Sequence, residues 1–123
     1  MKMKNLEIFS IAQAYNDAFA NFNEYLPVKV SFFMQKNIQT LNKLAQDIDE
    51  ARMKIVSNYG ELSEDGMQYI VPPESIEIAN EELTTLLEIE QEVAVHKIKL
   101  DAFDGIRFNP EQMQAIMFMI DEE

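Results

Sequence analysis

Hydrophobic residues recur with a period of seven between Val30 and Tyr59. The series consists of Met34, Leu41, Ile48 and Ile55, with Val30, Leu44 and Ala51 in the neighbouring stripe and Ile38, Ala45 and Tyr59 beside it. No glycine or proline interrupts this stretch, which Pro27 precedes and Gly60 follows. Two apolar positions in seven are typical of a helix that packs lengthwise against other helices. The pattern predicts one long helix, of about 45 Å at the usual helical rise.

Three shorter helices are predicted around it. Apolar residues at alternating steps of four and three indicate a first helix that ends before Pro27. Pro72-Pro73 and Asn109-Pro110 are placed to open two later helices, because asparagine caps a helix and proline suits its first turn. Only a short loop and one strand separate the second helix from the third, so we expect these two to be antiparallel. The predicted helices cover 6–23, 30–59, 74–92 and 110–120.

Two segments, 67–71 and 93–100, alternate between apolar and polar residues in the way that strands do. We expect them to pair as a ribbon that rests on the helices, because two strands alone are marginally stable. The length of 123 residues predicts a single domain over 1–123. The expected fold is mostly helical α+β, with a long antiparallel helical hairpin, a flanking N-terminal helix, a small two-stranded ribbon and a C-terminal helix.

The charge of the chain argues against several classes of function. Its 22 acidic and 10 basic side chains give a net charge of −12. Binding to nucleic acid or to an anionic membrane relies on lysine and arginine, so neither is expected. No apolar run approaches the roughly 18 residues of a membrane span. Glu7, Gln13 and Asp17 interrupt any signal-peptide core, which predicts a cytoplasmic location.

Residues that carry catalytic or metal chemistry are sparse. The chain has no cysteine, and His96 is its one histidine, for which a packed structural role is expected. The segment Glu61-x-Ser63-x-Asp65-Gly66 resembles the start of a calcium loop, but Pro72 stands where a bidentate glutamate is needed. A solvated turn is therefore expected there. No phosphate cradle or nucleophile motif is present, so we predict no catalytic residues, no metal, no cofactor and no enzymatic activity.

Three groups of residues are candidates for binding. Acidic residues of the third predicted helix recur three, four or seven apart and predict a partner-binding face: Glu74, Glu77, Glu81, Glu88 and Glu92. The last helix carries more apolar side chains than one buried stripe uses, which predicts a homo-oligomer, most simply a dimer. The expected contact consists of Met113, Met117, Phe118 and Ile120. The third candidate is a pocket near the ribbon formed by His96, Arg52 and Tyr59.

Several strings of the sequence belong together as a pattern. The long predicted helix follows the string Leu26-Pro27-Val28-Lys29-Val30-Ser31. It carries Lys36-Asn37 and, near its end, Ala51-Arg52 through Tyr59-Gly60-Glu61. Two further strings come after it, Glu64-Asp65-Gly66 and the acidic Glu82-Leu83-Thr84-Thr85-Leu86-Leu87. In these features, over residues 24–123, the chain resembles a family of small uncharacterised phage and prophage proteins. That family opens its last helix with Thr-Pro or Ser-Pro, whereas Asn109-Pro110 serves here. The resemblance implies a phage origin and no particular activity.

Three functions remain open from the sequence. The first is a non-catalytic phage interaction protein that binds a host or phage protein through its acidic face inside the host cell, for example as a counter-defence inhibitor. The second is a structural or assembly component of the phage that uses the hairpin as a packing unit. The third is an enzyme or small-molecule-binding protein with a pocket near the ribbon. Against all three, the acidic face can simply keep an apolar protein in solution.

Overall fold

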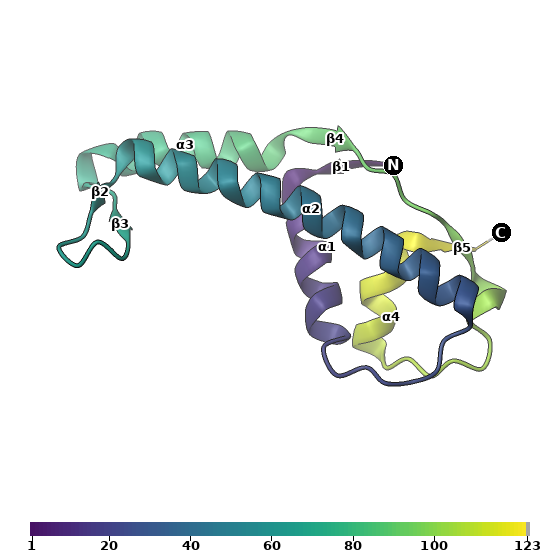
Figure 1. Ribbon diagram of the computed structural model, residues 1–123. Helices are drawn as coiled ribbons and strands as arrows, with labels where there is room; N and C mark the ends of the chain where they lie inside the picture. The colour runs from purple at the N-terminus through teal and green to yellow at the C-terminus, as the bar shows by residue number, and fades with distance from the viewer. Residues whose placement is uncertain (123) are drawn as a thin grey trace.

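One helix, α2, runs through the whole molecule; α3 lies along its last part, whereas α1 crosses it steeply and α4 packs beside α1 (Figure 1). The computed structural model describes residues 1–122, and α2 spans Val28–Tyr59. The other helices of the described chain are α1 (Asn5–Ala18), α3 (Pro73–Glu88) and α4 (Pro110–Ile116), with 3-10 turns at Leu100–Phe103 and Met117–Met119. The chain is 62% helical, which confirms the mostly helical α+β fold. Figure 1 also confirms that α2 and α3 are antiparallel.

Several helix boundaries differ from the predicted ones. The first helix ends at Ala18 rather than at residue 23, because Phe19 and Phe22 leave the helical path to pack on Phe108, with ring centroids 5.8 and 5.7 Å from it. The long helix begins directly after Pro27, two residues earlier than predicted. The last helix ends at Ile116 and tightens into a 3-10 turn.

The strands form three small two-stranded sheets within residues 1–122, not the single ribbon that we predicted. β1 (Lys2–Lys4) pairs antiparallel with β4 (Glu90–Glu92), and β2 (Glu61–Leu62) pairs antiparallel with β3 (Tyr69–Ile70). β5 (Ile98–Lys99) pairs in parallel with β6 (Ile120–Asp121). The predicted pairing of 67–71 with 93–100 is wrong. The 16 residues of α3 carry the chain away from β3 by roughly 24 Å before the second segment begins.

Two clusters of buried side chains hold the molecule together. The first core cluster comprises Met3, Ile8, Ala12, Ile38, Leu41, Ile48 and Val93. The second core cluster comprises Val30, Met34, Ile98, Phe103, Ile116, Met119 and Ile120. Both clusters draw on the first two thirds of α2, against which α1, α4 and the segment 93–103 are packed. We refer to this part of the molecule as the body.

Buried asparagines fix the ends of elements inside the body. Asn5 begins α1, and its side chain donates to the carbonyl oxygen of Leu86 at 2.8 Å, while its backbone N–H donates to that of Ile89 at 2.9 Å. Carbonyl groups at the end of α3 are thereby satisfied by α1. The chain can then leave the helix and pair with β1. This explains why α3 ends at Glu88 and not at residue 92 as predicted.

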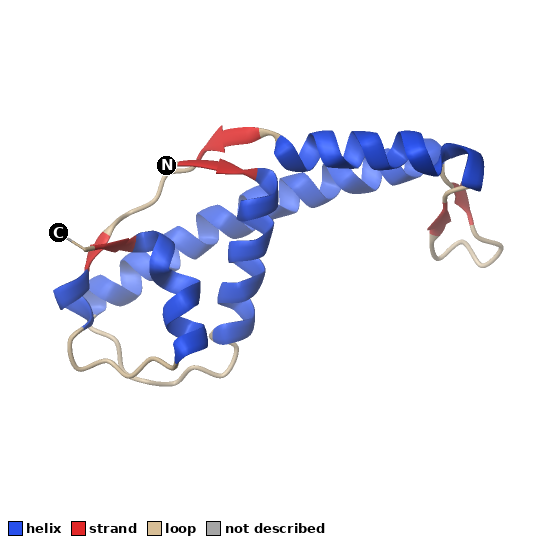
Figure 2. Cartoon of the chain, turned by 180° about the vertical axis from the view of Figure 1, so that it is seen from behind, coloured by secondary structure: helices blue, strands red, loops and turns tan. Residues whose placement is uncertain are grey.

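The remaining residues, 49–85, project from the body as an arm (Figures 1 and 2). The arm consists of the last part of α2, the β2–β3 hairpin and most of α3, and Figure 2 shows the hairpin at its far end. No residue of the arm belongs to either core cluster, and Ala79, at 3% exposure, is its one buried side chain. Within residues 1–122, no helix is both long and apolar enough to cross a membrane.

Candidate interaction surfaces

The outer side of α3 carries a row of carboxylates. At 100° per residue, Glu74, Glu77, Glu81 and Glu88 fall within about 60° of one another on the helical wheel. All four are exposed, and the buried Ala79 lies on the opposite side of the helix. We call these four residues the acidic face. The structure therefore places together four of the five residues that the sequence assigned to partner binding.

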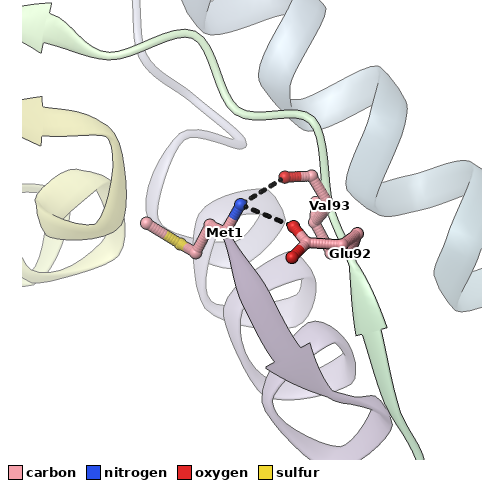
Figure 3. Close-up of polar contacts among 3 residues, drawn as sticks. All are labelled: Met1, Glu92 and Val93. Carbon is pink, nitrogen blue, oxygen red and sulfur yellow. Dashed lines mark hydrogen bonds and ion pairs between the residues drawn. The ribbon is translucent and has the colours of Figure 1, made fainter.

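Glu92 is the exception. It lies on β4, beyond the end of α3, and its Oε2 accepts from the amino group of Met1 at 3.1 Å (Figure 3). The same amino group also donates to the carbonyl oxygen of Val93 at 3.1 Å. Glu92 thus belongs to the body, where it extends the β1–β4 pairing. It is not continuous with the acidic face.

Apolar side chains gather at the far end of the arm. Leu62, Met67, Tyr69 and Ile70 are all exposed there, and Met67 keeps 82% of its surface accessible. We call these four residues the apolar tip. Isolated exposed apolar residues are ordinary, but a group of four on one small hairpin is typical of a binding surface. Sequence reasoning missed it, because the strand predicted over 67–71 was expected to pair with 93–100 and to rest on the helices, which would have covered most of these side chains.

The turn that connects β2 to β3 is well ordered by its own side chains. Asp65 accepts hydrogen bonds from the Ser63 hydroxyl and from the backbone N–H of Met67, the latter at 3.0 Å. These donors, the hydroxyl first, lower the pKa of the Asp65 carboxyl group. Gly66 has a φ of 70°, a conformation that glycine adopts without strain. The segment is the solvated turn that the sequence predicted.

The two helices of the arm cover each other incompletely. Ile55 and Leu83 are only half-buried, and Ile76 and Ile78 are exposed. A hydrogen bond of 2.8 Å from the Tyr59 hydroxyl to Glu82 Oε1 links α2 to α3 here, and it raises the pKa of Tyr59. Burial of apolar surface between α2 and α3 in the arm therefore contributes much less to the stability of the fold than burial in the two core clusters does.

The predicted pocket of His96, Arg52 and Tyr59 is not formed. Arg52 is paired with Asp49 at 2.6 Å, and Tyr59 with Glu82. His96 instead stacks on Phe33, which precedes Arg52 by 19 residues of α2, or about 28 Å. The packed structural role expected for His96 is limited to this ring contact, because the residue itself is exposed.

The predicted oligomer contact is largely buried in the body. Ile120 is 6% exposed and pairs with Ile98, and Met113 and Phe118 pack against the core clusters. Met117 alone of the four is exposed. A dimer through all four residues would require the body to open. The surplus of apolar residues in this helix is explained by its burial on several sides, between α1 and the segment 98–108.

Comparison of the chain with protein-family models, with curated proteins and with solved structures gives no match in any of the three. Within residues 1–122, no three histidine or acidic side chains come together as a metal site. The surfaces themselves therefore carry the functional argument.

Proposed function

We propose that the protein is a non-catalytic interaction protein of phage origin whose arm binds a basic surface on a bacterial host protein. Inhibition of that host protein, as in counter-defence, is the role that follows. The proposal rests on one observation above all: residues 49–85 contribute no side chain to either core cluster. An arm that adds so little to the stability of the body is best explained by what it presents to other molecules.

The acidic face, which runs along the arm and ends at Glu88 just beyond it, and the apolar tip complement each other chemically. The acidic face attracts a positively charged partner over a distance of about a Debye length, roughly 8–10 Å at ordinary ionic strength. The apolar tip then supplies contact area that is removed from water on binding, the main favourable contribution in protein association. The charges of the acidic face therefore speed and orient the encounter with the partner, and burial of the apolar tip stabilises the complex.

The test uses three forms of the whole chain as baits in a bacterial lysate. The first is the natural sequence, the second carries Glu81→Lys and Glu88→Lys, and the third carries Asp17→Lys and Glu24→Lys. The two variants change the net charge equally, but Asp17 and Glu24 are exposed residues of the body. The proposal requires a basic protein that the first and third baits capture and the second does not.

Measurement with the purified partner completes the test. The reversal at Glu81 and Glu88 is expected to weaken binding at least about tenfold, or about 1.4 kcal/mol, and binding of the natural protein is expected to fall steeply as salt is raised. Circular dichroism must show that the variant remains folded. Equal capture by all three baits, or binding that ignores salt, would show that the acidic face is only a solvated surface.

Self-association is the second candidate, because the half-covered seam of the arm favours it. A second copy that lays its arm along one edge of the seam would bury either Ile76 or Ile78, which are exposed on opposite edges of α3 in one chain. This arrangement fits the assembly role that the sequence left open. It differs from the first proposal in that a symmetric complex of this chain alone should form in the absence of any host protein.

A further inference from the structure

A cleft with the opposite charge to the rest of the molecule lies at the other end of α2, in the body. Its volume is about 490 Å³, and it lies between the first turns of α2 and the segment 97–102. Three of the chain's ten basic side chains line it: Lys29, Lys97 and Lys99. Asp101 is its one acidic side chain. Such a grouping is unexpected in a protein whose net charge is −12.

The charge of the cleft lysines is only partly balanced, because, in the part of the chain that the structure describes, Lys29 and Lys97 have no carboxylate partner in the cleft other than Asp101, whereas Lys99 also lines an adjoining pocket with Asp104, Asp121 and Glu122. Within residues 1–122, the ion pairs are made by the amino group of Met1, by Lys43 and by Arg52, so neither Lys29 nor Lys99 takes part in one. Lys97 donates to the carbonyl oxygen of Phe118 at 2.8 Å, a neutral partner. Ammonium groups that share a cleft repel one another, and a bound anion would relieve that repulsion.

The backbone that carries two of the lysines is firmly held. Asn37, 1% exposed, accepts from the N–H of His96 at 2.7 Å and donates to the carbonyl oxygen of the same residue at 2.9 Å. Lys97 follows directly. Ile98, the next residue, is buried in the second core cluster, so Lys97 and Lys99 flank a fixed point. The backbone positions of Lys97 and Lys99 beside the cleft are thereby fixed.

The walls of the cleft between the charges are apolar. Val30 and Phe33 contribute from α2, and the Phe33 ring is held by stacking on His96, with centroids 5.2 Å apart and planes inclined at 30°. Ligand sites typically combine apolar or aromatic walls with a few converging polar groups, in cavities of about 300–1,000 Å³. A bare inorganic ion would leave the apolar walls uncovered.

We propose that this cleft binds a small organic phosphate that carries a flat ring, of the size of a nucleoside monophosphate. Lys29 and Lys99 hold the phosphate, with Lys97 beside them as a third cation. The ring packs against Phe33 and Ala102, because Val30 keeps only 3% of its surface exposed. Asp101 accepts a hydrogen bond from a hydroxyl group of the ligand. The site does not depend on the arm, so it stands or falls separately from the proposed function.

The test uses AMP, adenosine and inorganic phosphate as probes, with binding followed by amide chemical shifts in the ¹⁵N-labelled full chain. AMP is expected to bind at least about tenfold more tightly than either fragment, because only AMP engages both the lysines and the apolar walls. Amides of 29–33 and 97–102 should move. No shift change up to about 5 mM, weaker than any useful small-molecule affinity, would overturn the proposal, as would equal binding of AMP and phosphate.

Matched variants locate the site. Lys29→Gln with Lys99→Gln is expected to weaken AMP binding at least about tenfold, whereas Lys2→Gln with Lys54→Gln removes the same charge from outside the cleft and should leave it unchanged. Lys97 is kept, because its bond to Phe118 supports the fold. Phe33→Leu should weaken AMP binding without weakening phosphate binding. If both lysine pairs reduce AMP binding equally, the interaction is general electrostatic attraction and the proposal is wrong.

Discussion

At the scale of single residues, a few buried polar side chains fix how segments distant in sequence meet. Asn37 is the clearest case, because it satisfies both backbone groups of His96, a residue 59 positions later in the chain. Buried backbone groups without partners cost free energy, so one side chain here secures an extended segment that has no neighbouring strand. Asn5 likewise joins α1 to the end of α3 through the hydrogen bond from its side chain to the carbonyl oxygen of Leu86.

Replacing Asn37 by alanine should therefore be strongly destabilising. The N–H and C=O of His96 would both lose their partner, at about 1–3 kcal/mol for each buried unsatisfied group. We expect urea denaturation to show a loss of about 2 kcal/mol or more in the free energy of unfolding. Asn16→Ala serves as the control, because Asn16 forms an exposed bond of 3.0 Å to Asn42 and should change stability by less than about 0.5 kcal/mol.

The phenol of Tyr59 offers a prediction about pH. Its pKa is raised, first because its hydroxyl donates to the Glu82 carboxylate. The stability that this bond confers is fully present below the ordinary tyrosine pKa of 10.0 and is lost as the pH rises through the higher folded value. Glu82→Gln should bring the pKa of Tyr59 back towards 10.0 in a titration followed by tyrosine ring signals. Tyr15, whose pKa burial raises, should not respond to the substitution.

At the scale of elements, α2 has two different environments along one unbroken helix. Up to Ile48 its apolar stripe is buried in the core clusters, and beyond Ile48 the stripe is only half-covered by α3. The sequence predicts the helix well, because the period of seven persists and no glycine or proline intervenes. It does not reveal the change of environment, since a periodic stripe looks the same whether or not a neighbour covers it.

Hydrogen exchange should make this difference measurable. Amides of 50–58 are expected to exchange faster than amides of 34–46, because local opening needs less free energy where little apolar surface is buried. Mass spectrometry of peptides from the two parts of α2 gives the comparison directly. Uniform protection along the helix would mean that the arm is as stable as the body, and would argue for a second copy packed on it.

The elements that the sequence predicts poorly are the extended ones. The segment 93–100 alternates as a strand does, yet only Ile98–Lys99 pairs, and the Asn37 side chain satisfies part of the rest. Likewise, β1 and β4 carry lysines and glutamates rather than strand-forming residues, and they pair Lys2 with Glu92 and Lys4 with Glu90. Contacts with residues distant in the sequence determine the structure of these segments, and the local sequence pattern does not indicate those contacts.

The candidate surfaces likewise divide into one that the local sequence predicts and others that only the tertiary fold creates. The four residues of the acidic face follow from helical spacing, which local sequence determines. The position of Glu92 off that face, the apolar tip and the cleft of Lys29, Lys97 and Lys99 depend on where α3 ends and on what packs beside α2. Residues 29 and 99 are brought together only by the tertiary fold, so no motif search along the chain finds them.

At the scale of the whole molecule, the body and the arm should be separable. Replacing residues 52–82 by a short glycine-asparagine turn removes no member of either core cluster and keeps Leu86, which Asn5 binds. The shortened chain is expected to unfold cooperatively in urea and to show dispersed amide signals. Loss of cooperative unfolding would mean that the arm takes part in folding the body. AMP binding should survive the excision, whereas partner binding should not.

Self-association stays a prediction, and the arm is the surface we now expect it to use. If the second candidate holds, light scattering at micromolar concentrations gives twice the 14.3 kDa of one chain, and amides of 50–58 are protected in the dimer. Ile76→Lys and Ile78→Lys, made separately, place charge on one edge of the seam or the other, and the variant whose edge forms the contact should return the mass to that of a monomer. A single-chain mass for the natural sequence would exclude the dimer and leave the arm free for a different protein.

The length of α2 fixes a separation between two sites. Its 32 residues place the cleft at one end and the hairpin at the other roughly 48 Å apart, with no hinge-forming glycine or proline between them. The helix thus sets the distance between the two sites. A partner held at the tip stands at a set distance and direction from whatever occupies the cleft, so the two ligands cannot touch unless one of them is large enough to span that gap.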